Sequence, residues 1–220
     1  MAKAVVFDFD GVIVDSEPLH YRTFCQTLKP LGIRIGWSRW YKDFAGTGSR
    51  KIIAKLFEEF GIQEDVSVWV ERRKALFASY AKQGKLRPRR GLRMFLSKLR
   101  TRNIKTAIAS GGHIAHIESL LSLMKLNGRF DAIVGGDSVK NGKPDPEIFL
   151  LAAKKLGVKP EECIAIEDSP AGCDAARRAG MPLICFNSPA RKSLNVSCIK
   201  TIDSYSEFPL ELLDVFHDQA

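Results

Sequence analysis

Short apolar runs recur along this 220-residue chain, and longer stretches with an apolar residue at every third or fourth position separate them. A short apolar run is typical of a buried strand, whereas the wider spacing is typical of a helix that faces a core. We predict strands at Val5-Val6-Phe7 and near residues 104 to 109, 131 to 135, 163 to 166 and 182 to 186. Strands that alternate with helices predict an α/β fold, a doubly wound parallel sheet with a Rossmann-like core.

The alternation stops between about residues 15 and 86, where the pattern is helical throughout. The segment 15–18 opens a predicted helix that reaches about Leu31, and the stretches Ser49 to Phe60 and Val66 to Lys82 carry apolar residues at helical spacing. Gly91 begins the return to alternating helix and strand. We therefore predict a core formed by residues 1–14 and 87–220 and an inserted all-helical cap domain at residues 15–86.

The first predicted strand brings two carboxylates, Asp8 and Asp10, to a turn at Gly11. Residues i and i+2 of a strand point to the same side, so both side chains would face one point if the strand continues through them. Two close carboxylates repel each other unless a cation lies between them, and Mg²⁺ takes carboxylate and phosphate oxygens. Asp8 would then be free to attack and Asp10 to move a proton. The alternative is a strand end whose acids only cap a turn.

Two later segments carry further chemical groups. Ser110 and the two glycines after it follow the strand near 104 to 109, and a small hydroxyl with bare backbone amides at a helix start makes an anion cradle. Lys143 precedes a helix for which Asp145 is the predicted N-cap, Pro146 the first residue and Gly157 the end.

A second acidic pair, Glu167-Asp168, ends the strand near 163 to 166. Taken singly, Ser110 is as well explained as a plain cap, Lys143 as a surface lysine, and the acids as helix-start residues favoured by the helix dipole. Together, however, the four groups lie at the ends of elements, where open α/β sheets place ligands.

These motifs resemble those of the haloacid dehalogenase-like hydrolases, in the branch with a helical cap after the first motif. The residues that carry the resemblance are DFDGVIVDS at 8–16, Ser110, KPDP at 143–146 and EDSPAG at 167–172. The resemblance implies a phosphoryl-transfer enzyme that forms an aspartyl-phosphate intermediate and uses Mg²⁺ as its cofactor.

The resemblance also implies a role for each residue that matches. Asp8 is expected to be the nucleophile and Asp10 the general acid and base. The expected phosphate-binding residues are Ser110, Gly111 and Lys143, and Lys143 also offsets the charge beside Asp8. The expected metal ligands are Asp8, the backbone carbonyl of Asp10, Asp168, and Glu167 through a bound water.

The chemistry of phosphoryl transfer suits these residue types, because it depends on positioning and on neutralising charge on the phosphoryl oxygens. Dehalogenation fits less well, since a halide leaving group requires neither protonation nor Mg²⁺. Asp10 and the pair Glu167-Asp168 therefore favour a phosphate ester as the substrate.

Selectivity is expected to come from the cap, because a cap of this kind closes out water as lids do. The candidate substrate-binding residues there are Ser16, His20, Gly46, Arg50 and Lys74. β-Phosphoglucomutase, a member of the same family, carries a histidine, an arginine and a lysine at comparable places. His20 and Lys74 match them, whereas Arg50 falls one position late when Gly46 is aligned.

The displaced arginine decides the ranking, because a mutase must hold a bisphosphate from both ends. We predict a Mg²⁺-dependent phosphatase of a small phosphorylated metabolite, with a sugar phosphate as the expected class. β-Phosphoglucomutase is the alternative, and a phosphate-binding protein without turnover is the third interpretation.

The composition is consistent with this prediction but would not by itself have led to it. The formal charge of +9 is explained either by attraction of anionic substrates or, as we favour, by a solvated basic surface. The five cysteines have no metal-ligand spacing, and no apolar run approaches a membrane span. We expect a cytoplasmic monomer that binds neither nucleic acid nor membrane.

Overall fold

The computed structural model describes residues 1–45, 47–187 and 197–215. The chain forms two compact units, and each is considered by itself. The first comprises Met1–Asp15 and Arg87–Ala220, and the second comprises Ser16–Leu86. We refer to them as the core unit and the helical unit.

The core unit is built on one parallel sheet. Its strands are β1 (Ala4–Phe7), β2 (Lys105–Ala109), β3 (Ala132–Val134), β4 (Cys163–Glu167), β5 (Leu183–Phe186) and β6 (Lys200–Ile202). The strand order is β3-β2-β1-β4-β5-β6, and every neighbouring pair is parallel. Phe7 lies opposite both Ile108 and Ile166, so the carboxyl ends of the three central strands are level. The predicted doubly wound parallel sheet is confirmed.

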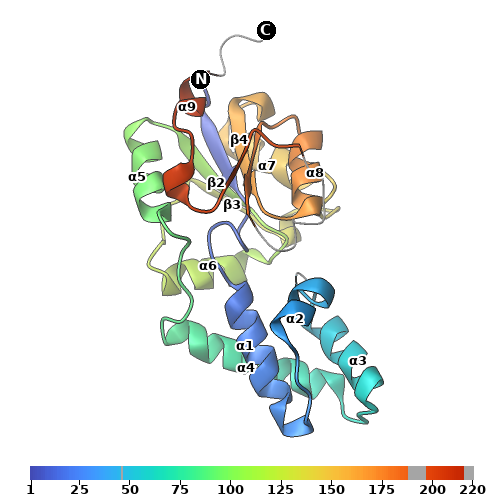
Figure 1. Ribbon diagram of the computed structural model, residues 1–220. Coiled ribbons are helices and arrows are strands. Elements are labelled where there is room, and N and C mark those ends of the chain that lie inside the picture. Colours follow the sequence, from blue (N-terminus) through green and yellow to red (C-terminus); the bar gives the residue numbers. More distant parts are fainter. Residues whose placement is uncertain (46, 188–196, 216–220) are drawn as a thin grey trace. The chain divides into compact units, whose positions relative to one another are not determined.

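Helices cover both faces of this sheet (Figure 1). One face packs against α7 (Glu147–Leu156) and α8 (Pro170–Arg178), where small strand residues such as Ala107 and Ala165 let the helices approach closely. The other face is aromatic: Phe7 meets Phe95 of α5 (Leu92–Thr101) edge to face, with ring centroids 6.1 Å apart. The remaining helices of the core unit are α6 (Ile114–Leu123) and α9 (Leu212–Val215). The central strands β1 and β4 are therefore buried on both faces, as their uninterrupted apolar runs predict.

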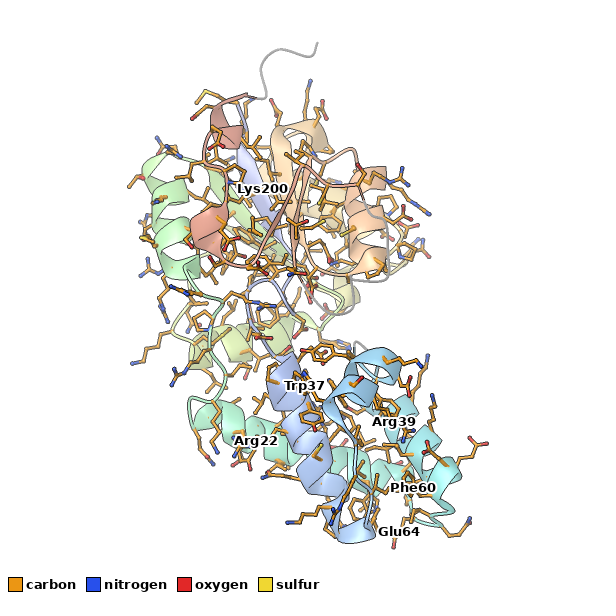
Figure 2. The ribbon with its side chains drawn as sticks, viewed as in Figure 1. Arg22, Trp37, Arg39, Phe60, Glu64 and Lys200 are labelled. Atoms are coloured by element: carbon orange, nitrogen blue, oxygen red, sulfur yellow. The ribbon has the colours of Figure 1, made fainter. Side chains whose placement is uncertain are left out.

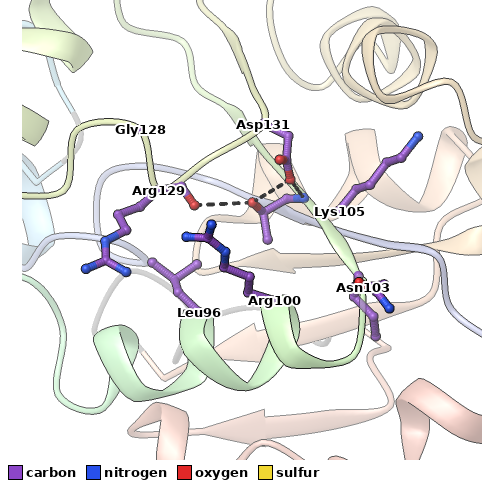
Figure 3. Close-up of a pocket in the computed structure, with 9 residues that line it drawn as sticks. Leu96, Arg100, Asn103, Lys105, Gly128, Arg129 and Asp131 are labelled. Carbon is purple, nitrogen blue, oxygen red and sulfur yellow. Dashed lines mark hydrogen bonds between the residues drawn. The ribbon is translucent and has the colours of Figure 1, made fainter.

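The amino end of the sheet is held by polar contacts. Asp131 accepts hydrogen bonds from the backbone N–H and the hydroxyl of Thr106, at 2.7 and 3.1 Å. A surface pocket of about 330 Å³ lies beside them, with Arg100 and Arg129 in its wall (Figure 3). The candidate catalytic residues lie at the opposite, carboxyl end of the strands, so this pocket is separate from them.

The helical unit contains α1 (Glu17–Leu28), α2 (Trp37–Asp43), α3 (Ser49–Phe60) and α4 (Val66–Lys82). Their apolar faces form one buried cluster around Trp40, Ile53 and Leu56. The Trp40 indole N–H donates to Glu17 at 2.8 Å, which satisfies the polar edge of that buried ring. Trp37, by contrast, is 44% exposed on α2 (Figure 2).

Three details differ from the prediction. Strand β1 ends at Phe7 and does not continue through Asp10, because the chain turns at Gly11, where φ is +78°. Helix α7 begins at Glu147 with Pro146 in the cap position, although Asp145 does accept the Glu147 N–H at 2.9 Å. Strand β6 was not predicted. Among the described residues, no helix is long and apolar enough to cross a bilayer.

Candidate active site

Three carboxylates meet where β1 and β4 end. Asp8 follows β1 directly, and its N–H donates to the Ile166 carbonyl at 2.9 Å, which continues the strand pairing by one residue. Glu167 is the last residue of β4 and Asp168 follows it. One oxygen from each of the three carboxylates lies within 4.8 Å of the others. The register of two neighbouring strands thus brings together residues that are about 160 positions apart in the sequence.

Lys143 joins two of these acids. Its Nζ donates to Asp8 Oδ1 at 2.5 Å and to Glu167 Oε1 at 2.6 Å, and all three side chains are buried or nearly so. Burial lowers the pKa of Lys143, but the charges of Asp8 and Glu167 outweigh burial and the net pKa is raised. Lys143 is therefore a fixed positive charge between two carboxylates.

The loop that carries Lys143 is anchored at the start of α7. The Glu147 carboxylate accepts the backbone N–H groups of Lys140 and Asn141, at 3.1 and 2.9 Å. These bonds lower the pKa of Glu147. A charged hydrogen bond of this kind fixes the turn that leads to Lys143.

The site holds more negative charge than one lysine neutralises. Burial raises the pKa of Asp8 to about 8 against the opposing effect of Lys143, and Glu167 and, more weakly, Asp10 add to the rise. Burial also raises the pKa of Asp168 well above its usual range, and the charges of Glu167 and Asp8 act in the same direction. A divalent cation would relieve this strain, because it favours the ionised form of each carboxylate.

The oxygen donors suit a hard cation such as Mg²⁺. Glu167 Oε2 is already engaged by the N–H groups of Asp168 and Ser169 and by the Ser169 hydroxyl, at 2.7, 2.8 and 3.0 Å. Its other oxygen accepts from Lys143. Glu167 is therefore suited to orienting the site, and Asp8 and Asp168 are the acids suited to direct coordination.

Two glycines make room for these acids. A Cβ on Gly11 would lie 2.0 Å from Asp168 Oδ2, and a Cβ on Gly172 would lie 1.6 Å from Glu167 Oε1. Any side chain at either position would displace a carboxylate of the cluster. The sequence carries this signal, since both glycines belong to the motifs quoted above, but it does not say what each glycine contacts.

The other predicted core residues lie at the same edge of the sheet. Ser110 follows β2, is buried, and accepts the Gly112 N–H through its hydroxyl at 3.1 Å. Gly111 has open space where a side chain would be. Asp10 lies in the turn after β1, where the Gly11 N–H donates to the Val14 carbonyl at 2.7 Å. The end of β2 therefore carries a buried hydroxyl and a glycine with open space beside it, and their role as a phosphate cradle stays a prediction.

The predicted cap residues have different environments. Ser16 is buried at the start of α1, and its carbonyl accepts the N–H groups of Leu19 and His20. Arg50 is exposed and donates to the Ser67 hydroxyl at 2.8 Å. Lys74 is exposed and pairs with Glu71 at 2.8 Å. Gly46 lies outside the described residues.

The cation next to His20 is Arg73, which our sequence reasoning missed. Arg73 is 6% exposed, and its guanidinium contacts His20 Nδ1 and donates to the Ser49 hydroxyl at 3.2 Å. It lies against the rings of Phe24 and Phe77, 4.9 and 5.0 Å from their centroids. A usable signal existed, because Arg73 is four residues before Phe77 and three after Val70, on the apolar face of α4.

Arg73 lacks the partner that a buried cation usually has. Among the described residues, no carboxylate lies within 4.0 Å of its guanidinium, and its Nε has no hydrogen-bond partner. Burial lowers the pKa of Arg73 to about 10, against a smaller opposing effect of the Glu17 charge. A buried arginine without an ion pair is costly, so its position in the helical unit calls for an explanation.

Comparison with known proteins places the chain in a family. A model of the haloacid dehalogenase-like hydrolases matches residues 2–180. A Thermotoga maritima protein named "Phosphorylated carbohydrates phosphatase" is 32% identical over 186 residues, which cover 83% of each chain. The chain therefore belongs to the haloacid dehalogenase-like hydrolases.

Solved structures agree in fold over almost the whole chain. CbbY from Rhodobacter sphaeroides, in complex with phosphate, has a TM-score of 0.78 and is 27% identical, over 98% of this chain and 100% of that one. β-Phosphoglucomutase from Clostridium difficile has a TM-score of 0.75 and is 25% identical, over 98% of this chain and 97% of the other.

Proposed function

We propose that the chain is a Mg²⁺-dependent phosphatase that hydrolyses a small phosphorylated metabolite, a sugar phosphate, through an aspartyl-phosphate on Asp8, and that it acts as a monomer. The single observation that carries the proposal is the cluster of Asp8, Glu167 and Asp168, in which the Lys143 ammonium pairs with Asp8 and Glu167. Membership of the family supports hydrolysis. The relative named a phosphorylated carbohydrates phosphatase and the phosphate complex of CbbY support this substrate class.

The proposed first half-reaction transfers the phosphoryl group to the protein. An Asp8 carboxylate oxygen attacks phosphorus, and the bond between phosphorus and the ester oxygen breaks. Asp10 donates a proton to that departing oxygen, so the alcohol leaves neutral. Lys143 faces Asp8 at 2.5 Å and reduces the charge repulsion between the nucleophile and an anionic ester.

The second half-reaction releases phosphate. Asp10 accepts a proton from water while the water oxygen attacks phosphorus, and the bond to Asp8 breaks to give back the carboxylate. Ser110 and the backbone at Gly111 are proposed to hold the phosphoryl oxygens during both steps. Asp8 and Asp168, the carbonyl of Asp10 and, through water, Glu167 are proposed to hold Mg²⁺, which supplies positive charge to the phosphoryl oxygens when bound.

The helical unit is proposed to select the substrate. The candidates remain Ser16, His20, Gly46, Arg50 and Lys74. We add Arg73 because it is buried beside His20 and no described carboxylate lies at ion-pair distance from it. An anionic or hydroxyl-rich substrate group would supply the acceptors that Arg73 lacks.

A second candidate is β-phosphoglucomutase activity, favoured by one observation. Arg73 places a buried cation beside His20, and a mutase needs a cation to hold the second phosphate of its bisphosphate intermediate. This arginine comes from α4 and not from the segment near Gly46, so we rank hydrolysis first.

A panel of phosphate esters tests both candidates. Purified protein with Mg²⁺ is given sugar phosphates, including β-glucose 1-phosphate with a trace of the bisphosphate, and phosphate release and glucose 6-phosphate formation are measured. We expect phosphate release from at least one sugar phosphate and loss of release in EDTA. The D8N variant, purified in the same way, controls for contaminating phosphatases. Isomerisation without phosphate release would replace the phosphatase with the mutase, and inactivity towards all esters would favour a phosphate-binding protein.

A further inference from the structure

Arg89 holds the loop that follows β1, and none of the family motifs includes it. Its side-chain Nε donates to the Gly11 carbonyl at 2.7 Å, and its backbone N–H donates to the Ile13 carbonyl at 2.8 Å. Next to it, Pro88 forms an isolated antiparallel bridge with Val14. The segment that re-enters the core unit at residue 87 is thus bonded to the segment that leaves it at residue 15.

The loop that Arg89 holds is part of the candidate active site. Gly11 follows Asp10 directly and lies so close to Asp168 that a Cβ would be 2.0 Å from the Asp168 carboxylate. A shift of the Gly11 peptide would therefore move the Asp10 backbone and displace Asp168 at the same time. Both groups are proposed metal ligands, so the position of Gly11 controls two oxygens of one site.

The guanidinium is itself well fixed. It lies over the Phe186 ring, 5.3 Å from the centroid, and its Nη1 is 3.6 Å from Asp15 Oδ2. Its side chain is 19% exposed. A planar guanidinium held by a ring, a carboxylate and a carbonyl has little freedom, so it can define the orientation of the carbonyl that it contacts.

Tyr205 provides an internal comparison. Its hydroxyl donates to the Val12 carbonyl at 3.1 Å, so the same loop is held from a second side. Tyr205 is neutral and bonds one residue further along the chain. Arg89 differs because it bonds Gly11 itself and because its charge acts on Asp168 in favour of the carboxylate form.

We propose that Arg89 is a positioning residue for the metal site: its bond to the Gly11 carbonyl holds the Asp10 backbone and Asp168 in the arrangement that binds Mg²⁺. This inference rests on the proposed function, because it takes these residues as the metal ligands. It predicts that Arg89 affects metal binding more than it affects folding. Residues outside the ligand set that orient metal ligands typically change metal affinity or activity by about 10- to 100-fold when replaced.

The test uses four variants of the full chain. R89M removes both the charge and the bond to Gly11, and R89K keeps the charge without the Nε–H donor. R90M replaces an exposed neighbouring arginine, and D15N removes the carboxylate partner while leaving the Gly11 bond. Mg²⁺ binding is measured by isothermal titration calorimetry, the Mg²⁺ dependence of phosphate release is measured on the best ester, and thermal unfolding is followed for each protein.

We expect R89M to weaken Mg²⁺ binding by about 10- to 100-fold, with R89K intermediate. R90M should stay within about twofold of the wild type, as exposed charges usually do. D15N should weaken Mg²⁺ binding less than R89M does, because the bond from Arg89 to Gly11 remains. Raised Mg²⁺ should restore much of the lost turnover in R89M, because the defect lies in metal affinity. A variant that was only less stable would not show this recovery.

Two outcomes would overturn the inference. One is an R89M protein that binds Mg²⁺ like the wild type, even if it unfolds at a lower temperature, since Arg89 would then only brace the loop. The other, which decides the matter if R89M does not fold, is wild-type Mg²⁺ affinity in R89K. If the wild type hydrolyses no ester, the proposed function fails, whereas calorimetry on the same proteins still decides the role of Arg89.

Discussion

The buried cations of the two units have opposite surroundings. In the core unit, Lys143 lies between the carboxylates of Asp8 and Glu167. In the helical unit, Arg73 contacts His20 and Ser49 but has no carboxylate at ion-pair distance among the described residues. The core unit therefore has an excess of buried carboxylates, whereas among the described residues the buried arginine of the helical unit has no carboxylate partner and its Nε has no hydrogen-bond partner.

Under the proposed function, this difference assigns the chemistry to the core unit and substrate selection to the helical unit. An excess of buried carboxylates is suited to a metal ion, and a lysine among them is suited to a phosphoryl group. An unpaired buried arginine is suited to a substrate group that arrives from outside. We therefore expect substitutions in the core unit to affect every substrate and substitutions at Arg73 to affect some substrates more than others.

The largest expected effect on turnover is at Asp8, the proposed nucleophile. In D8N an amide replaces the carboxylate, and an amide is a poor nucleophile, so turnover of every ester should fall by about 10³-fold or more. Initial rates on the ester panel measure this. The fold should survive, because the side chain is nearly isosteric, and circular dichroism provides the control. A D8N protein that retains most of its turnover would contradict the division of roles between the two units.

The second-largest effect is expected at Lys143. K143M removes the positive charge between Asp8 and Glu167 while keeping much of the aliphatic chain, and kcat should fall by about 10²- to 10³-fold on all esters alike. Lys140, an exposed lysine of the same loop, offers the matched control K140M, for which we expect kcat close to that of the wild type. A K143M defect confined to particular substrates would place Lys143 in selection and remove the contrast.

In the helical unit, substitution of Arg73 should have a smaller effect that depends on the substrate. R73M should lower kcat/KM by roughly tenfold or more for the ester whose remaining groups it binds, because a hydrogen bond to a charged group is lost. For p-nitrophenyl phosphate, which offers few such groups, we expect little change. The comparison variant R72M removes the exposed arginine next to Arg73 on the same helix and should change neither value by more than about twofold.

A disturbed fold of the helical unit would also lower kcat/KM in R73M, and R73K distinguishes this explanation from the loss of a substrate contact. R73K keeps the charge in the same place but has no planar fork, so it should recover part of the activity on the preferred ester. If R73M and R72M have the same kinetics on every ester, Arg73 has no part in selection.

The smallest effect is expected at Glu147, which supports Lys143 without contacting it. The N–H groups of Asn141 and Lys140 lower the pKa of Glu147, so its contribution to stability is present at neutral pH and is lost as the pH falls through that lowered pKa. The melting temperature of E147Q should lie below that of the wild type near pH 7, and the two should converge as the pH falls below the lowered pKa of Glu147. A constant difference between them across this range would show that the Glu147 charge is not responsible.

The sequence predicted the core of the fold because its apolar runs are short, as buried strands are, and alternate with longer segments of helical spacing. It missed β6, whose three residues Lys200–Ile202 are mostly exposed and contain one buried apolar residue. It left open whether the first strand continues through Asp10, since the turn after Phe7 depends on the positive φ of Gly11 and on hydrogen bonds from distant segments.

The residues of the candidate site also divide into those that the sequence identified and those that it missed. Asp8, Lys143, Glu167 and Asp168 were identifiable because motifs and strand ends together determine where they lie. In the helical unit, the identity of the inward cation depends on helix rotation, and one residue along an α-helix turns the side chain by about 100°. That single step separates the buried Arg73 from the exposed Lys74, and an alignment of cations alone does not distinguish them.

Arg89 was not identifiable in this way. Its contact with Gly11 joins residues 78 positions apart, at the two places where the chain passes between its units. A basic cluster at residues 87–90 gave no sign of which arginine turns inward. Only the folded chain distinguishes the half-buried Arg89 from the exposed Arg90.

The most direct test of the account is to trap the covalent intermediate on Asp8. The wild type is mixed with Mg²⁺ and its best ester, quenched in acid during turnover, and reduced with borohydride, which converts an aspartyl-phosphate to homoserine. Peptide mass spectrometry then locates the reduced residue. The account predicts homoserine at position 8, dependent on both Mg²⁺ and substrate. Steady hydrolysis with no modification at position 8, or with homoserine at another aspartate, would contradict it.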